Sequence, residues 1–111
     1  MRLRNAVLAA ASALALVLAV PVSADAAGGE FRYKYRNALG EQLGALFDPR
    51  SGECVKVPEA TEEEAAYTPS NRTNAAATVY AGFDCRGGES YVLRPGGQAG
   101  SRLLVRSVRF S

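Results

Sequence analysis

The chain has 111 residues, 13 basic and 11 acidic side chains, and no histidine. A chain of this length forms one domain with a modest core, and it carries no basic block of the kind that nucleic-acid binding requires. The absence of histidine removes the commonest general base, the Ser-His and Cys-His nucleophile pairs and the usual zinc ligand. The composition therefore predicts neither an enzyme nor a protein with a metal or other cofactor.

The first 26 residues predict an export signal. Two arginines near the start precede an uncharged apolar run over residues 6–20, and Ala24-Asp25-Ala26 fits the A-x-A cleavage pattern. We expect cleavage after Ala26, with cleavage after Ala24 or Ala27 as close alternatives. A membrane anchor is the competing interpretation, but the run is short for a span of about 20 residues. The expected product is a secreted domain of residues 27–111, with no membrane contact after cleavage.

Residues 31–36 alternate perfectly between aromatic and basic side chains. This period of two predicts a half-buried strand. One face carries Phe31, Tyr33 and Tyr35, and the other carries Arg32, Lys34 and Arg36. The basic stripe is either a solvated strand face or a surface for an acidic partner or an anionic cell-wall polymer.

Two further strands and two turns are expected before Pro58. Residues 37–40 have turn chemistry, and residues 42–47 predict the returning strand. Residues 48–52 predict a second turn, and residues 53–57 a third short strand.

Residues 59–77 predict a long polar surface loop. Thr61-Glu62-Glu63-Glu64 has the spacing of a capping box, which would allow one helical turn. Long loops of this kind are often functional or simply mobile. The three glutamates could also be imagined as catalytic carboxylates, but a run in a polar loop is typical of a solvated face.

Short strands separated by glycine-rich turns are expected in the remainder. The predicted strands cover residues 78–80, 89–93 and 103–110, with turns over residues 83–88 and 95–97. This spacing predicts an all-β protein with the architecture of a sandwich or small barrel.

Cys54 and Cys85 are the only cysteines of the chain. In an exported protein they are expected to form one disulfide, and two buried free thiols are the alternative. A bridge across 31 positions would contribute about 3 to 4 kcal/mol in the chain-entropy model.

The segment from Ala77 to Phe110 resembles one Greek-key motif of the βγ-crystallin fold. The matching residues are Tyr80, Gly87, Tyr91, Leu93, Pro95-Gly96 and Ser107-Val108-Arg109-Phe110. The resemblance implies a small Greek-key sandwich, with a positive φ at Gly87 and a Ser107 hydroxyl bonded to the folded hairpin. Leu103 and Leu104 stand on or beside the positions where calcium-binding members carry Asn or Asp, so no calcium site is expected.

A weaker repeat of the same spacing lies upstream. Tyr33, Gly40 and Leu46 repeat the spacing of Tyr80, Gly87 and Leu93. Residues 55–57 would then stand where residues 108–110 stand. Either the chain contains two motifs of about 40 residues, or these are two unrelated hairpins.

Three functions compete. Secreted crystallin-like proteins of soil actinomycetes include a metalloproteinase inhibitor family, which this chain resembles in size, export and expected fold but not in its richer cysteine pattern. An inhibitor needs an exposed loop held rigid by its scaffold, and residues 59–71 are the candidate. The second function, which the sequence favours, is a structural or cell-envelope-associated protein without a catalytic role. A secreted enzyme or toxin using Glu and Arg is the third and least favoured.

Overall fold

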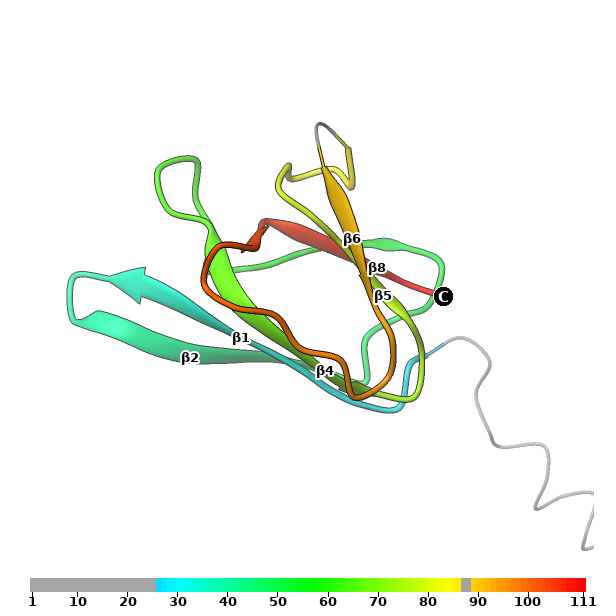
Figure 1. Ribbon diagram of the computed structural model, residues 1–111. Coiled ribbons are helices and arrows are strands. Elements are labelled where there is room, and N and C mark those ends of the chain that lie inside the picture. Colours follow the sequence, from blue (N-terminus) through cyan, green and yellow to red (C-terminus); the bar gives the residue numbers. More distant parts are fainter. Residues whose placement is uncertain (1–25, 87–88) are drawn as a thin grey trace, which may run out of the picture.

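Alternating buried and exposed residues form the strands of two antiparallel sheets (Figure 1). The computed structural model describes residues 26–86 and 89–111. This part of the chain contains strands and turns but no helix. The strands are β1 (Gly29–Asn37), β2 (Gly40–Phe47), β3 (Cys54–Lys56), β4 (Ala66–Thr73), β5 (Ala77–Tyr80), β6 (Ser90–Leu93), β7 (Leu104–Val105) and β8 (Ser107–Phe110).

The β1–β2 hairpin follows the alternation of its sequence. Phe31 and Tyr33 are buried and Arg32 is exposed, which confirms the predicted half-buried strand. Gly44 of β2 lies opposite Tyr33, and a β-carbon there would come within 2.4 Å of the tyrosine ring. A glycine is therefore required at this position, because the aromatic ring occupies the space of a side chain.

Each sheet combines three strands from one half of the chain with one strand from the other half. The strand orders are β2-β1-β4-β7 in the first sheet and β3-β8-β5-β6 in the second. The two orders correspond strand by strand. In the second sheet, β6, β5 and β8 take the places that β2, β1 and β4 have in the first, and β3 takes the place of β7. The two halves therefore interlock, since the third strand of each half lies at an edge of the opposite sheet.

The predicted surface loop over residues 59–77 is wrong for about half of its length. Its second half contains β4, which pairs with both β1 and β7 inside the first sheet. The strand was missed because its buried side chains include a proline and polar residues, namely Pro69, Asn71 and Thr73. Residues 57–65 connect β3 to β4, and the short segment 74–76 connects β4 to β5.

Internal hydrogen bonds explain why polar residues can be buried in β4. The amide of Asn71 donates to the backbone oxygens of Ala75 and Leu93, at 2.8 Å in both cases. Its side-chain oxygen accepts from the hydroxyl of Thr73 at 2.7 Å. These bonds replace those that water would supply, so burial leaves no polar group of the pair unsatisfied.

The predicted final strand over residues 103–110 is two strands in opposite sheets. β7 pairs with β4 in the first sheet, and β8 pairs with β3 and β5 in the second. Arg106 is the single residue between them. The backbone N–H of Arg106 donates to the oxygen of Tyr80 at 2.8 Å.

Two smaller expectations also need correction. Residues 55–57 do not stand where residues 108–110 stand: β3 is hydrogen-bonded to β8 in the same sheet, and β4 takes the corresponding place in the first sheet. The capping-box spacing at Thr61 produces a turn and no helix.

The core lies between the two sheets, and one disulfide adds a covalent link within the second layer. The rings of Phe31 and Phe110, one from each sheet, meet edge to face with their centroids 5.5 Å apart. Cys54 and Cys85 form the predicted disulfide, with their Cα atoms 5.9 Å apart. The bridge joins β3 to the connection between β5 and β6, and it is compatible with an extracellular location.

Candidate functional site

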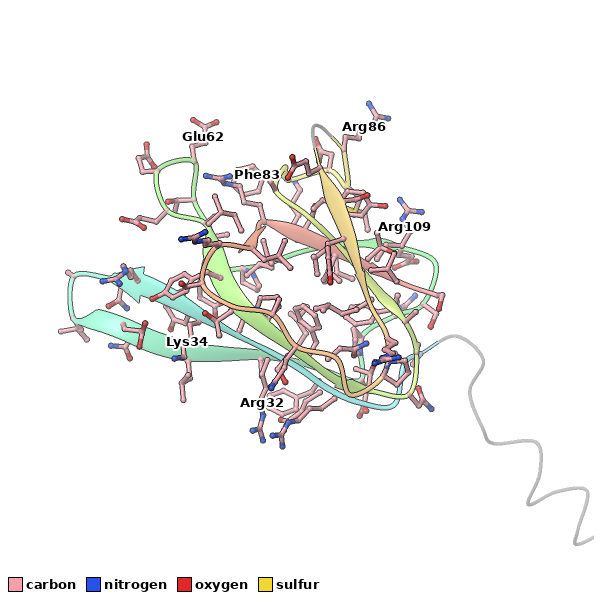
Figure 2. The ribbon with its side chains drawn as sticks, in the orientation of Figure 1. Arg32, Lys34, Glu62, Phe83, Arg86 and Arg109 are labelled. Carbon is pink, nitrogen blue, oxygen red and sulfur yellow. A yellow bond between two sulfur atoms is a disulfide. The ribbon has the colours of Figure 1, made fainter. Side chains whose placement is uncertain are left out.

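The connection between β3 and β4, residues 57–65, is named the acidic loop. Residues 61–64 at its tip are exposed, whereas Val57 and Ala65 at its ends are buried. Figure 2 shows Glu62 at the tip, pointing away from both sheets. The loop is therefore a projecting element with both ends fixed in the core.

A turn inside the acidic loop fixes the shape of the tip. The hydroxyl of Thr61 accepts a hydrogen bond from the backbone N–H of Glu64 at 3.0 Å. The backbone N–H of Thr61 donates in return to the oxygen of Glu64 at 2.8 Å. The first bond is that of a capping box, whereas in the second the backbone oxygen of Glu64 takes the place of its side chain, and together they close a turn.

Arg106 binds the acidic loop to the rest of the molecule. Its Nε donates to the oxygen of Thr61 at 3.0 Å, and its Nη2 donates to the oxygen of Glu62 at 2.9 Å. Its Nη1 donates to the oxygen of Ala81 at 3.0 Å, and the guanidinium lies 5.9 Å from the ring centroid of Phe83. The planar, rigid fork of arginine suits such a three-way contact.

The role of Arg106 could not be foreseen from the sequence. Its partners are backbone oxygens, which every residue carries, so no pattern of residue types marks them. The one available signal is its place between Val105 and Ser107, where the chain leaves one sheet for the other.

A second contact fixes the start of the acidic loop. The hydroxyl of Tyr33, in β1, donates to Oε1 of Glu59 at 2.5 Å. Burial of the ring and the neighbouring carboxylate raise the pKa of Tyr33 above its ordinary value. The phenol therefore stays protonated as a hydrogen-bond donor over the physiological pH range.

Ser107 lies at the start of β8 and is fully buried. Its hydroxyl donates to the oxygen of Gly82 and accepts from the N–H of Cys85 at 2.9 Å. Tyr80 pairs with Ser107 across the sheet. Gly87 lies outside the described residues, and the residue with a positive φ in the described part of this connection is Cys85, at 53°.

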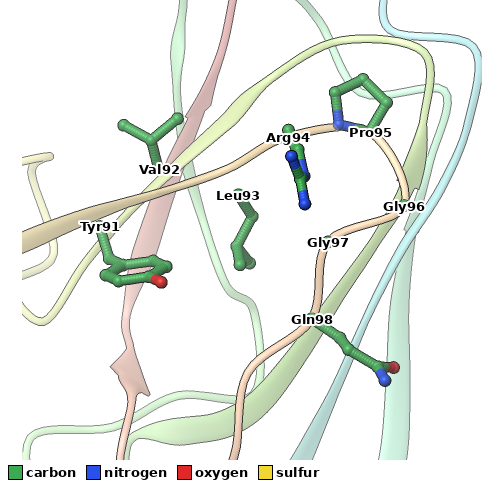
Figure 3. Close-up of a pocket in the computed structure, with 8 residues that line it drawn as sticks. All are labelled: Tyr91, Val92, Leu93, Arg94, Pro95, Gly96, Gly97 and Gln98. Carbon is green, nitrogen blue, oxygen red and sulfur yellow. The ribbon is translucent and has the colours of Figure 1, made fainter.

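An open hollow of about 690 Å³ lies beside β6. Figure 3 shows Tyr91, Leu93 and Arg94 pointing into the space between this strand and the returning segment 96–98. The lining residues are Tyr91, Val92, Leu93, Arg94, Pro95, Gly96, Gly97 and Gln98. They include no carboxylate, serine or cysteine, and the polar side chains among them are those of Tyr91, Arg94 and Gln98.

Within residues 26–86 and 89–111, no three His, Cys, Asp or Glu side chains are grouped closely enough to hold a metal ion. The same part of the chain contains no helix that is long and apolar enough to cross a membrane. Comparison of the chain with protein-family models, with curated proteins and with solved structures found no match.

Proposed function

We propose that residues 27–111 form an exported, non-catalytic binding module whose contact element is the acidic loop. The observation that carries the proposal is the attachment of this loop by Arg106, which donates to two of its backbone oxygens. Ordering a mobile loop on binding costs affinity, and a loop that is already held in shape avoids this cost. An exposed and preorganised loop is what an inhibitor of an extracellular peptidase requires.

The proposal includes a scaffold of two interlocked Greek-key motifs of the βγ-crystallin kind. Two observations support it: the matching strand orders of the two sheets, and the buried hydroxyl of Ser107 on the connection between β5 and β6. Secreted metalloproteinase inhibitors share this kind of scaffold, so an extracellular peptidase is the first partner class to test.

The test is inhibition of metallo- and serine peptidases by residues 27–111. We expect inhibition of at least one class, weakened tenfold or more by Arg106→Lys, because lysine cannot reproduce the three-way fork. Arg109→Lys is the matched control, since Arg109 is an exposed arginine of β8 that donates to the oxygen of Gly52, away from the loop.

Two results would contradict the proposal. One is an absence of inhibition in every class. The other is inhibition that Arg106→Lys and Arg109→Lys weaken equally, with unchanged melting temperatures, because the loop would then not be the contact element.

A further inference from the structure

The first sheet has a face that points away from the second sheet, here named the outer face. Strand register places its members: Phe47 is paired with Glu30, Ala45 with Arg32, and Leu43 with Lys34, while Arg72 of β4 is paired with Glu30 from the other side. Figure 2 shows Arg32 and Lys34 extending together away from the body of the molecule. The outer face therefore combines an apolar strip on β2 with a basic strip on β1 and β4.

The apolar strip is unusually exposed for a small domain. Leu43 is 80% exposed and Phe47 is 73% exposed. Between them lies a hollow of about 380 Å³, lined by these two side chains together with Arg32, Tyr33, Gly44 and Ala45. Contiguous exposed apolar surface beside charged residues is typical of a site that contacts another molecule or a membrane.

The charge of the outer face is positive. Glu30 forms an ion pair with Arg32, and its backbone partner on β4 is Arg72, which adds a second arginine beside one carboxylate on this face. Lys34 lies 3.8 Å from Glu41, which is exposed at the start of β2.

Arg36, at the end of the basic strip, lies over the ring of Tyr67 at 5.7 Å and has no carboxylate within ion-pair distance among the described residues. Arg36 also lines a hollow together with Glu63 and Glu64 of the acidic loop, so it is not counted with the outer face. The outer face then carries three basic groups, Arg32, Lys34 and Arg72, and two acidic ones, Glu30 and Glu41.

We propose that the outer face docks on the surface of an anionic lipid bilayer. Leu43 and Phe47 would enter the boundary between headgroups and acyl chains, and the basic strip would contact the headgroup phosphates. Arginine has five N–H donors, so Arg32 can contact a phosphate while it remains paired with Glu30.

Charge and exposure together favour this occupant over others. A second copy of the chain would bring two positive faces together, which repel each other. A soluble anionic polymer would satisfy the basic strip but leave Leu43 and Phe47 in water.

This contact differs from the expectation of no membrane partner, which rested on the absence of a spanning segment. A surface contact needs no span. In Figure 2 the acidic loop, marked by Glu62, points away from the side that carries Arg32 and Lys34. The proposed lipid contacts of Leu43, Phe47 and Arg72 use no residue of the binding loop, and they give the envelope-associated role a physical basis.

The test is cosedimentation of residues 27–111 with vesicles of mixed phosphatidylglycerol and phosphatidylcholine, and with vesicles of phosphatidylcholine alone. We expect binding to the anionic vesicles only, and less binding as salt screens the charges. The double substitution Leu43→Ser with Phe47→Ser should reduce the partition coefficient at least tenfold. Arg72→Gln should reduce it about fivefold, the effect of one basic residue near the surface.

The matched control is Tyr91→Ser with Val92→Ser. These side chains of β6 are 54% and 61% exposed, but they lie on the second sheet. The control should bind like the unmodified domain, and circular dichroism must show that both double variants are folded.

Three results would overturn the proposal: no binding to anionic vesicles, equal binding to both vesicle types, or equal losses in the two double variants. Sedimentation equilibrium without lipid distinguishes the competing occupant. A dimer that Leu43→Ser with Phe47→Ser dissociates would assign the outer face to a second copy instead. Peptidase inhibition should survive Leu43→Ser with Phe47→Ser. The lipid contact and the binding loop can therefore fail separately, and each is tested by its own assay.

Discussion

Replacing Ser107 by alanine removes a hydroxyl that joins β8 to the connection between β5 and β6. The hydroxyl makes two hydrogen bonds in a fully buried position, one to the oxygen of Gly82 and one from the N–H of Cys85. Alanine fills almost the same volume but neither donates nor accepts. Two backbone groups would therefore lose their partner without any gain in packing.

The size of the effect follows from these lost bonds. A buried polar group left without a partner costs about 1 to 3 kcal/mol. In a domain of this size, each kcal/mol lowers the melting temperature by about 4 to 8 °C. We therefore expect Ser107→Ala to destabilise the domain by about 1 to 3 kcal/mol, with a clear drop in its melting temperature.

Urea unfolding measures the effect, and a double-mutant cycle identifies its cause. A β-carbon on Gly82 would come within 2.3 Å of the oxygen of Arg86, so Gly82→Ala disturbs the same connection. The effects of Ser107→Ala and Gly82→Ala on the free energy of unfolding should be non-additive, because both substitutions disturb the connection between β5 and β6. Ser90→Ala is the control, since Ser90 is an exposed serine that also pairs with Tyr80. A loss below about 0.5 kcal/mol for Ser107→Ala, or strict additivity, would refute this reasoning.

Three further predictions concern processing, the disulfide and alkaline pH. Intact-mass measurement of the secreted form should give an N-terminus between Asp25 and Gly28, and a product that still begins at Met1 would contradict the export signal. The secreted form should contain no free thiol, and Cys54→Ser or Cys85→Ser should each lower the free energy of unfolding by about 2 to 4 kcal/mol in urea. Because the pKa of Tyr33 is raised in the folded state, its contribution to stability is complete below the unfolded pKa of about 10 and is lost as pH rises above it. Tyr33→Phe should therefore make the free energy of unfolding fall less steeply above this pH, and identical slopes for the two proteins would count against the effect.

The sequence predicted the strands in which apolar side chains are buried and charged side chains are exposed. The alternation of Phe31, Arg32 and Tyr33 places apolar groups inside and charged groups outside, and β1 follows it. The same reasoning failed for β4, because one of the hydrogen bonds that permit burial of Asn71 is made to Leu93, which is 22 positions away in the chain. A polar residue is predicted to be exposed when the hydrogen-bond partners that would allow its burial cannot be identified from the sequence.

The sequence predicted the position of the loop but not the contacts that hold it in shape. The sequence indicated a loop near Thr61, and the structure has one there, but the predicted length was too great because β4 was missed. Arg106 was not identified, since it acts on backbone oxygens of residues more than 40 positions away. Likewise, Leu43 and Phe47 are exposed because they lie on the face of β2 that points away from the second sheet, and the sequence does not reveal which face of β2 that is.

The interlocked topology explains why the acidic loop is held so firmly, and it also bears on why the loop exists. Between β3 and β4 the chain crosses from the second sheet to the first, and the equivalent crossing of the other half, between β7 and β8, runs from the first sheet to the second. The second crossing takes one residue, Arg106, whereas the first takes residues 57–65. The two crossings touch, because the N–H of Val57 donates to the oxygen of Arg106 at 3.0 Å and the guanidinium of Arg106 reaches the loop tip.

A single residue is enough to make such a crossing, so the additional length of the acidic loop is not needed for the fold. Loops that extend beyond what a scaffold requires, and that the scaffold nevertheless holds rigid, are where binding residues concentrate, and this argues for the acidic loop as the contact element.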